Sequence, residues 1–534
     1  MTDQPLFSII TPVYDPPLRF LEECIDSVLG QDFHDWEWCI ADDASPNPAV
    51  RARLERLAEE EPRVRLCLRE ENGGIVAGTN SAFGLATGRF VALLDHDDEL
   101  EHHALQVMAD LVDAEPDLDF AYSDESVWDV NQNRYVRWFK PGWSPERMRC
   151  QNYANHLSIF RRALVEEVGA WLPGTEGAQD HSLILRISER ARAIRHVPQS
   201  LYRWKTVPGS TVGDASAKPY AFENGLRAVQ EHCDRVGIDA EVVHGPDLGI
   251  YRLRRRLTKT PLVSIVIPSN GPVGEAHGRP WSFLEETVSG VLEGTDYGNV
   301  EVIVVPDPET DGDILQRVAA TDPQRVRIAP RVPRPFNFSR KTNLGAAYAR
   351  GEYLLFLNDD MEITHPDWLG NMLAIAQMPD VGAVGAKLVF EDGSMQHAGV
   401  YLWHGPGHYG FGIRQQDSGY LGVWEVDREC VAVTGACLLT PMRVFSEVGG
   451  FTLSLASNWQ DVDYCLKARA IGLRNIWTPQ AVLTHFESIT RNPRVLDVER
   501  MWLHGRWARE ILTDPYFSPA DRPVGPMWPI EWYR

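Results

Sequence analysis

The sequence predicts an α/β protein built from two copies of one domain, each with a mainly parallel sheet. One observation is a repeat: the segment PLFSIITPVYDP from Pro5 returns as PLVSIVIPSNGP from Pro261. The other is that short β-branched runs alternate with stretches of helical spacing inside each copy. Strands that alternate with helices favour a parallel sheet, because a crossover helix returns the chain to the edge where it started.

The repeat continues through most of both halves. FLEECIDSVL from Phe20 returns as FLEETVSGVL from Phe283, and TNSAFGLATGRFVALLDHDDEL from Thr79 returns as TNLGAAYARGEYLLFLNDDMEI from Thr342. Both pairs are separated by the same offset of 263 residues. A period of this length indicates a duplicated domain rather than a solenoid of short repeats.

The elements of the first copy can be placed from their residues. The run over 7–11 predicts a strand that ends in a proline turn, and apolar residues at helical spacing over 18–28 predict the helix that follows. Further strands are expected over 37–41 and 90–94, and each ends in aspartates. Because ligands bind beyond the carboxyl ends of parallel strands, these aspartates are expected on the ligand edge.

We expect two domains over 1–211 and 261–500. A packed linker over 212–260 is expected to join them, because Pro219 precedes a helical apolar face and a basic segment follows at 252–256. The residues 501–534 form a tail rich in Trp and Pro, and its fold is left open.

Composition limits the class of partner. The chain has 52 Lys and Arg against 75 Asp and Glu, and the net charge of −23 disfavours nucleic-acid binding. The eight cysteines are scattered without metal-site spacing, which indicates free thiols in a reducing compartment. No signal peptide or long apolar run is present, so a cytoplasmic location is expected, and peripheral contact with the inner face of the membrane stays open.

An acidic cluster follows the strand over 90–94. Asp95, Asp97 and Asp98 repel one another unless a cation or protons intervene, and hard oxygen ligands suit Mg²⁺ or Mn²⁺ bridged to substrate phosphates. No GxGxxG follows the first strand, and no P-loop occurs in the chain. A solvated acidic turn with Asp98 as a helix cap is the alternative. Recurrence of the cluster over 358–360 as Asn-Asp-Asp favours the metal.

A second carboxylate recurs in the pairs Gln179-Asp180 and Gln460-Asp461, each at the start of an expected helix. Such an Asp can be an N-cap, but its repetition favours a general base that takes a proton from an attacking hydroxyl. A metal-bound diphosphate paired with a carboxylate base is what glycosyl transfer from a nucleotide sugar needs.

Both halves resemble family-two glycosyltransferases with the GT-A fold. The whole chain is similar to tandem-domain members associated with bacterial O-antigen, rhamnan and related surface polysaccharides, over nearly all of residues 5–500. The segments that carry the resemblance are ITPVYD, ENGGIVAGTNSAFGLATGRFVALLDHDDEL, YSDES, FKPGWSP and GAQD in the first copy, and TNLGAAYARGEYLLFLNDD, VGAVGAKLVFEDG, MQHAGV, AVTGACLLT, WQDVDYCLK and LTHFESITR in the second.

The resemblance implies a role for individual residues of both copies. The implied roles are catalytic base for Asp180 and Asp461; metal ligand for Asp95, Asp97, Asp360 and His485; nucleotide contact for Pro12, Tyr14, Asp42, Asp43, Pro268, Asp307 and Asn358; and phosphate or acceptor contact for Arg203, Asp124 and Trp459.

Each copy departs from the family pattern in a different place. The first copy has Arg203 at the position that we match to His485, and a guanidinium binds phosphate rather than metal. In the second copy Asp307 stands alone where an acidic pair is usual, and Asn358 weakens the DxD motif.

These features predict an inverting transferase that uses Mg²⁺ or Mn²⁺. Its expected donor is a UDP- or dTDP-linked sugar, and its expected acceptor is a hydroxyl of a growing, lipid-linked cell-surface glycan. Either both domains are catalytic, or one is catalytic and the other binds acceptor or scaffolds the chain. A non-catalytic sensor of nucleotide sugars is disfavoured by the intact Asp180 and Asp461. The basic run over 252–256 and the C-terminal tryptophans suit a membrane surface, although a solvated linker and a packed tail are favoured.

Overall fold

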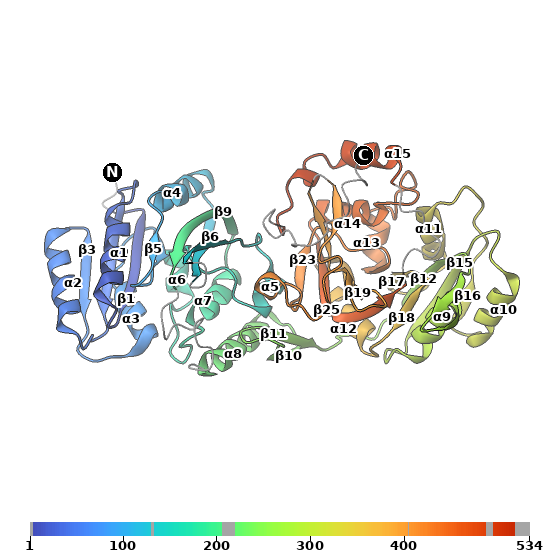
Figure 1. Ribbon diagram of the computed structural model, residues 1–534, viewed down its shortest axis with the longest axis horizontal. Helices are drawn as coiled ribbons and strands as arrows, with labels where there is room; N and C mark the ends of the chain where they lie inside the picture. Colours follow the sequence, from blue (N-terminus) through green and yellow to red (C-terminus); the bar gives the residue numbers. More distant parts are fainter. Residues whose placement is uncertain (1–3, 130–132, 206–218, 404, 487–494, 518–534) are drawn as a thin grey trace. The chain divides into compact units, whose positions relative to one another are not determined.

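The computed structural model describes residues 4–129, 133–205, 219–403, 405–486 and 495–517 (Figure 1). The chain divides into an N-terminal unit of residues 1–143 and 148–253 and a C-terminal unit of residues 144–147 and 254–534. Most of the segment expected as a linker therefore belongs to the N-terminal unit.

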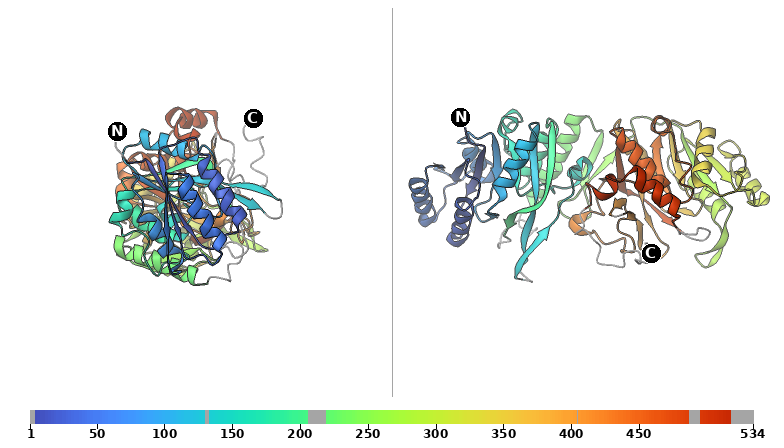
Figure 2. Two further views of the ribbon diagram at one scale, coloured as in Figure 1. Left: turned by 90° about the vertical axis from the view of Figure 1, so that its left-hand side faces the viewer. Right: turned by 90° about the horizontal axis from the view of Figure 1, so that it is seen from above.

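The N-terminal sheet contains β1 (Phe7–Val13), β2 (Trp36–Asp42), β3 (Val64–Leu68), β4 (Phe90–Leu93), β5 (Glu99–Leu100), β6 (Leu118–Asp129), β7 (Arg134–Trp138), β8 (Ser158–Arg161) and β9 (Ala193–Trp204). Their order is β3-β2-β1-β4-β8-β6-β9-β5, and β7 pairs with β6. The first four strands are parallel, whereas β8 is antiparallel to both of its neighbours. The expected α/β class with a mainly parallel sheet is confirmed. Figure 2 shows the β6–β7 hairpin extending from the body of its unit.

The helices of the N-terminal unit are α1 (Leu18–Leu29), α2 (Pro48–Glu60), α3 (Gly74–Phe83), α4 (Ala104–Ala114), α6 (Arg162–Glu167), α7 (Gln179–Ser188) and α8 (Pro219–Val236). The short helix α5 (Pro145–Cys150) is divided between the two units. The hairpin of β10 (Ala240–His244) and β11 (Tyr251–Arg255) follows α8. Every residue of β1 and β2 is buried, as expected for strands covered on both faces. The predicted apolar face of α1 is its buried face.

The C-terminal sheet repeats this topology in the order β16-β15-β12-β17-β24-β19-β25-β18. Its main strands are β12 (Val263–Ser269), β15 (Val300–Pro306), β16 (Val326–Ile328), β17 (Tyr353–Leu357), β18 (Met361–Ile363), β19 (Val381–Val389), β24 (Cys437–Pro441) and β25 (Arg474–His485). Shorter strands are β13 (Val273–Ala276), β14 (Arg279–Ser282), β20 (Met395–His397), β21 (Val400–Leu402), β22 (Pro406–His408) and β23 (Arg428–Cys430). The shared strand order shows that the sequence repeat is a repeat of the whole fold.

The helices of the C-terminal unit are α9 (Phe283–Glu293), α10 (Gly312–Thr321), α11 (Phe338–Tyr348), α12 (Trp368–Ala376), α13 (Met442–Glu447), α14 (Gln460–Ala470) and α15 (Asp497–Arg506). Part of the expected tail packs on this unit, since Trp507 Nε1 donates to Asp463 Oδ1 at 2.8 Å. Trp528 and Trp532 lie outside the described residues. Among the described helices, none is long and apolar enough to cross a membrane.

Candidate functional site

A cavity of about 430 Å³ opens at the carboxyl ends of β12, β15 and β17 in the C-terminal unit. This volume lies within the range of about 300–1,000 Å³ that is usual for small-molecule sites. The predicted residues that line it together are Pro268, Asp307, Asn358, Asp360, Asp461 and His485. The sheet therefore gathers six residues that are spread over more than 200 positions of sequence.

The local fold explains how the acidic loop meets His485. The chain leaves β17 at Leu357, passes through Asn358 to Asp360, and returns as the short strand β18. β18 is antiparallel to β25, with Met361 opposite His485. The last residue of β25 is therefore held beside the loop that follows β17.

Asp360 and His485 approach each other without forming a hydrogen bond. Asp360 Oδ1 lies 3.0 Å from His485 Nε2. This oxygen is buried, and no described residue donates a hydrogen bond to it. His485 Nδ1 lies 2.5 Å from Oε1 of Gln396. Because an amide oxygen can only accept, Nδ1 carries a proton, and in the neutral imidazole Nε2 then keeps its lone pair. In that neutral form the 3.0 Å approach brings two lone pairs together.

This pair fits a divalent cation. Two ligand atoms 3.0 Å apart match adjacent positions on one ion with bonds of about 2.1 Å. Asn358 Nδ2 lies 3.1 Å from the same Nε2, which agrees with a lone pair on that nitrogen. Among the described residues, no group of three or more His, Cys, Asp and Glu side chains is arranged around a metal site. Asp360 and His485 are thus the two ligands that the described part of the chain brings together here, as in sites where water and substrate phosphate complete the shell of Mg²⁺.

Asp461 lies in the first turn of α14 and lines the same cavity. The backbone N–H of Gly435 donates to Asp461 Oδ2 at 2.8 Å, and the N–H of Val462 donates to Oδ1 at 2.9 Å. These two donors fix the orientation of the carboxylate. Its position beside the acidic loop suits a base that acts near a bound diphosphate.

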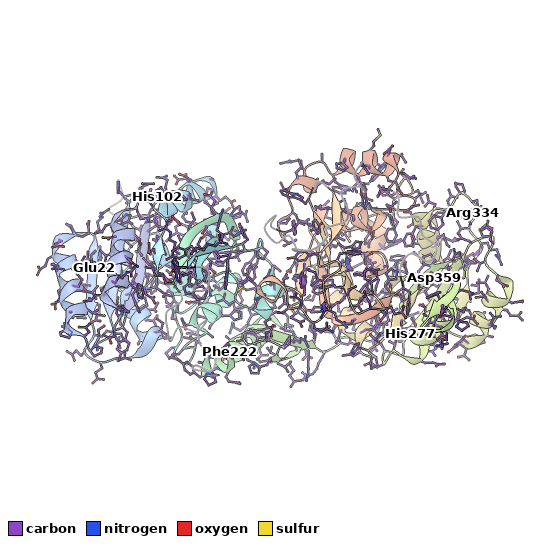
Figure 3. The ribbon with its side chains drawn as sticks, viewed as in Figure 1. Glu22, His102, Phe222, His277, Arg334 and Asp359 are labelled. Carbon is purple, nitrogen blue, oxygen red and sulfur yellow. The ribbon has the colours of Figure 1, made fainter. Side chains whose placement is uncertain are left out.

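The end of the cavity near Pro268 holds a buried charge pair. Lys341 Nζ lies 3.1 Å from Asp307 Oδ1 and donates to the carbonyl oxygen of Ser269 at 3.0 Å. Burial lowers the pKa of Lys341, while Asp307 opposes the shift. Asp359, marked in Figure 3, also lines the cavity, and burial together with the Asp360 charge raises its pKa to about 7.

Three of the residues at this site were not predicted from the sequence. Lys341, Gln396 and Phe336 line the cavity or contact its histidine. Gln396 belongs to the MQHAGV segment, which is one of the segments that carried the family resemblance, but the resemblance gave this residue no role. Lys341 directly precedes the repeated segment that starts at Thr342, and the first copy has Gly78 at this position, so the difference between the copies was the available signal.

The corresponding cavity of the N-terminal unit has a volume of only about 30 Å³. Pro12, Asp95 and Asp180 line it, as does His156. Such a space holds little more than a water molecule. The cavity beside the acidic loop is therefore much smaller in the N-terminal unit than in the C-terminal unit.

Two of the predicted nucleotide contacts of the first copy, Asp42 and Asp43, form hydrogen bonds with neighbouring residues of the protein. Asp43 Oδ1 accepts from Arg69 Nε at 2.6 Å, and Asp43 Oδ2 accepts from the N–H of Gly74 at 2.8 Å. Asp42 Oδ1 accepts from Ser45 Oγ at 2.5 Å. Tyr14 is another of the four predicted contacts, and its side chain is half exposed. Of these four residues, Pro12 alone is among the described residues that line the cavity.

The acidic loop of the first copy is tied to β9 through Asp98. Tyr202 Oη donates to Asp98 Oδ2, and the N–H of Lys205 donates to Oδ1, both at 2.8 Å. Burial and the charges of Asp95 and Asp97 raise the pKa of Asp98 well above its ordinary value. Burial also raises the pKa of Asp97. The loop is thus a set of mutually repelling carboxyls, as the sequence predicted.

Asp180 lies in the first turn of α7 and faces the small cavity. Trp171 Nε1 donates to Asp180 Oδ1 at 3.2 Å, and Gln179 Nε2 lies 3.4 Å from Oδ2. Burial raises the pKa of Asp180 to about 6, and the neighbouring Asp95 charge adds to the shift. A carboxyl with this pKa accepts protons near neutral pH, as a general base requires.

Arg203 does not occupy the position of His485. β9 and β25 end the same number of residues after their Pro-Gln pairs, so Trp204 is the counterpart of His485. The strand pairing agrees, because Arg203 lies opposite Glu99 of β5, and Thr484 lies opposite Glu362, the equivalent residue of β18. The expected match was wrong by one residue, and in a strand such a shift moves the side chain to the other face.

The three predicted phosphate or acceptor contacts are not among the described residues that line either cavity. Arg203 pairs instead with Glu101, through Nε–Oε1 at 2.8 Å. Asp124 is buried, and it accepts from His196 Nε2 at 2.8 Å. Trp459 precedes α14 with a left-handed φ of 62°. Their roles toward a ligand stay predictions.

Comparison with known proteins identifies the family. Residues 8–169 and 264–425 each match Glycosyl transferase family 2. The chain belongs to this family. The family domain is present twice, which confirms the tandem arrangement and the resemblance to surface-polysaccharide enzymes of the GT-A type.

The relatives of this family-two glycosyltransferase are longer proteins. It is 40% identical over 531 residues to the uncharacterized protein y4gI of Sinorhizobium fredii, covering 96% of this chain and 57% of that protein. It is 36% identical over 530 residues to the O-antigen biosynthesis protein RfbC of Myxococcus xanthus, covering 97% and 40%. The chain thus spans about half the length of these relatives. The solved structure of S. aureus TarS 1-349 in complex with UDP-GlcNAc is 22% identical, with a TM-score of 0.36, covering 42% of this chain and 66% of that one.

Proposed function

We propose that the C-terminal unit transfers a sugar from a UDP- or dTDP-linked donor to a hydroxyl of a growing cell-surface glycan, with inversion at the anomeric carbon. The observation that carries this proposal is the single cavity lined by Pro268, Asp307, Asp360, Asp461 and His485. Its volume of about 430 Å³ has room for much of a nucleotide sugar.

Asp461 acts as the base in this proposal. Its carboxylate takes the proton of the acceptor hydroxyl, and the oxygen attacks the anomeric carbon from the face opposite the diphosphate. The new glycosidic bond forms as the bond to the diphosphate breaks. The N–H groups of Gly435 and Val462 support this role, because they hold the carboxylate in one orientation during the proton transfer.

Asp360 and His485 would hold the cation in this proposal. When bound, Mg²⁺ or Mn²⁺ neutralises charge on the departing diphosphate. Gln396 keeps the Nε2 lone pair of His485 turned toward the cavity by accepting the Nδ1 proton. Pro268 and Asp307 line the same cavity, and the base and ribose of the donor would bind beside them.

The test is sugar transfer by the full chain carrying Asp461→Asn or Asp360→Asn. Each is expected to lower the rate by about 10²–10⁴-fold, through loss of the base or of charge neutralisation on the leaving group. Asp463→Asn is the matched control: it lies in the same turn of α14, but Thr452 and Trp507 bind it. Transfer that persists at the wild-type rate in both cavity variants would refute the proposal.

For the N-terminal unit we propose that it binds acceptor or scaffolds the chain. The small cavity and the engagement of Asp43 by Arg69 support this division of labour. The alternative is a bifunctional enzyme, for which Asp180 and its raised pKa are the support. Product analysis of Asp180→Asn and Asp461→Asn separates them, because two different missing linkages mean two active domains.

We also propose that the acceptor is lipid-linked and that α15 contacts the membrane. Val498 and Met501 on this helix are 60% and 75% exposed. The basic run over 252–256 is a weaker candidate than expected, because Arg255 is buried between Glu146 and Asp427. The test is co-sedimentation of the protein with anionic vesicles. If Met501→Asp co-sediments as strongly as the wild type, α15 does not contact the membrane.

A further inference from the structure

Two histidines of the C-terminal unit form a pair at the wall of the cavity. His397, the last residue of β20, is fully buried. Its Nδ1 lies 2.8 Å from Nδ1 of His408, the last residue of β22. The two rings meet nearly at right angles, with an interplanar angle of 77°. His408 lines the cavity, so the pair connects the buried interior of the unit with the cavity surface.

The backbone decides where the proton of His397 lies. The N–H groups of Gly399 and Thr434 both donate to His397 Nε2, each at 3.3 Å. Because a backbone N–H can only donate, Nε2 carries no proton, and the proton of the ring is on Nδ1. Burial and the neighbouring His408 lower the pKa of His397 well below its ordinary value, which agrees with a neutral ring. His397 Nδ1–H therefore donates to His408.

This hydrogen bond fixes His408 as a neutral donor. Since its Nδ1 accepts from His397, the proton of the neutral His408 ring is on Nε2. A second proton would have to sit on Nδ1, where two N–H groups would face each other across 2.8 Å. Every hydrogen bond of Nε2 is then one that it donates. His408 thus contributes an uncharged N–H group to the wall of the cavity.

One loop holds both this pair and the proposed base. Thr434 and Gly435 are consecutive, and the N–H of Thr434 donates to His397 while the N–H of Gly435 donates to Asp461. The acceptor sugar must approach Asp461, because its hydroxyl loses a proton there. An uncharged donor suits a neutral hydroxyl oxygen better than a diphosphate, to which a cationic donor would bind about twice as strongly.

The N-terminal copy has a tryptophan at the equivalent position. Glu125 of β6 corresponds to Leu388 of β19 through the offset of 263 residues. Trp138 lies opposite Glu125, as His397 lies opposite Leu388. An indole can only donate, so it cannot accept from the backbone and pass a donated hydrogen bond to a neighbour. The pair therefore belongs to the copy that has the larger cavity.

We infer that His408 donates a hydrogen bond from Nε2 to a hydroxyl oxygen of the acceptor sugar, and that His397 is the positioning residue that keeps the proton of His408 on Nε2. The hydrogen bond holds the acceptor sugar while Asp461 takes the proton of the attacking hydroxyl. This inference rests on the proposed function, since it adds a contact for the acceptor in the same cavity.

The first experiment locates the protons by ¹⁵N NMR of the full chain labelled at histidine. His408→Gln removes one histidine signal and so assigns it. In the wild type we expect His408 to have an unprotonated Nδ1 and a protonated Nε2. His397→Gln can still accept from the N–H groups of Gly399 and Thr434, but it has no donor at the position of Nδ1, so His408 should become a mixture of tautomers. A wild-type His408 with its proton on Nδ1, or an unchanged His408 signal in His397→Gln, would overturn the inference.

The second experiment measures sugar transfer to p-nitrophenyl glycosides, which serve as acceptor probes. His408→Leu should lower kcat/KM for the glycoside by about 10–100-fold, because the sugar hydroxyl loses its donor. His408→Gln has an amide N–H at the position of Nε2 and should recover most of this loss. His397→Gln should show the loss, whereas His397→Asn, which keeps a donor at the position of Nδ1, should recover most of it. A purely structural role of His397 would give the opposite order, because Gln keeps the backbone contacts and Asn does not.

Binding of UDP and dTDP with Mg²⁺, measured by titration calorimetry, separates the acceptor from the diphosphate. The affinities of His408→Leu should stay within about threefold of the wild-type values, a difference of less than about 1 kcal/mol. A loss of about tenfold or more would place His408 on the diphosphate and overturn the inference.

His365→Leu is the matched control for loss of a histidine, since His365 is exposed and contacts Thr364. It should behave as the wild type in all three assays. Wild-type transfer by His408→Leu, with Asp461→Asn inactive, would refute this inference and leave the proposed function standing. A wild type that transfers no sugar would count against the proposed function, and the NMR result would still decide the proton positions of the pair.

Discussion

Replacing Asp180 by Asn is expected to stabilise the N-terminal unit above pH 6. The carboxyl has an ordinary pKa of 3.8, and burial raises its pKa to about 6 in the folded chain. Because the folded pKa is the higher one, ionisation of Asp180 opposes folding: stability is lost as the pH rises from about 4 to about 6 and stays lost above it. At 1.36 kcal/mol per pKa unit, the cost is about 3 kcal/mol at pH 7.5.

The Asn side chain keeps an oxygen for the Trp171 N–H and cannot ionise. At pH 4 the variant and the wild type should therefore have similar stability, and at pH 7.5 the variant should be more stable. For a domain of 150–250 residues, about 3 kcal/mol corresponds to a rise of about 6–12 °C in the melting temperature of that unit. The buffer must contain a chelator, because a bound cation would offset the repulsion from Asp95.

Thermal unfolding of both proteins between pH 4 and pH 7.5 is the assay. Asp117→Asn is the control, since this side chain is 78% exposed and its charge is solvated. A melting-temperature difference between the Asp180 variant and wild type that does not change over this pH range would refute the reasoning. So would a variant that is less stable at every pH, because then the hydrogen bonds of the carboxylate outweigh its desolvation.

Three further predictions concern the C-terminal unit. Gln396→Leu should weaken Mn²⁺ binding by about 10–100-fold because it frees the His485 Nδ1–H, whereas Gln396→Glu should retain binding, as measured by manganese titration. Mn²⁺ affinity should rise with pH through about 7, because Asp359 ionises there and its negative charge lies beside the cation site. Asp359→Asn should flatten this pH dependence, and an unchanged slope in the variant would contradict the role given to Asp359. Gly345→Ala should destabilise the fold by about 1–3 kcal/mol in denaturant unfolding, since its Cβ would lie 2.2 Å from Val266 Cγ1.

The sequence predicted much of the C-terminal site because its residues follow predictable strands. Pro268, Asp307 and Asn358 all come at or just after the carboxyl end of a buried apolar run, and such ends share one edge of a parallel sheet. His485 was matched by family resemblance, and the β18–β25 register explains why it meets Asp360. The family resemblance gave these positions their expected roles, and the strand ends explain why the structure brings them together.

The contacts across strands could not be read from the sequence. Arg203 was placed one residue out because antiparallel register depends on the ladder between β5 and β9, which the sequence leaves unspecified. Lys341 gains its role from a neighbour 34 positions away, Asp307, and Gln396 from His485. Side chains that act through long-range pairs carry no local signal.

By itself the sequence determined that this chain has two α/β domains, that each has an acidic loop and a second carboxylate, and that the class is glycosyltransferase. The two domains follow from hydrophobic period and duplication, the carboxylates from the residues at the strand and helix ends, and the class from the resemblance of these segments to family-two glycosyltransferases. Only the tertiary structure decided that one copy opens a cavity of about 430 Å³ while the other leaves about 30 Å³. Free volume depends on how side chains from distant strands and loops pack together, and packing of that kind is decided in three dimensions.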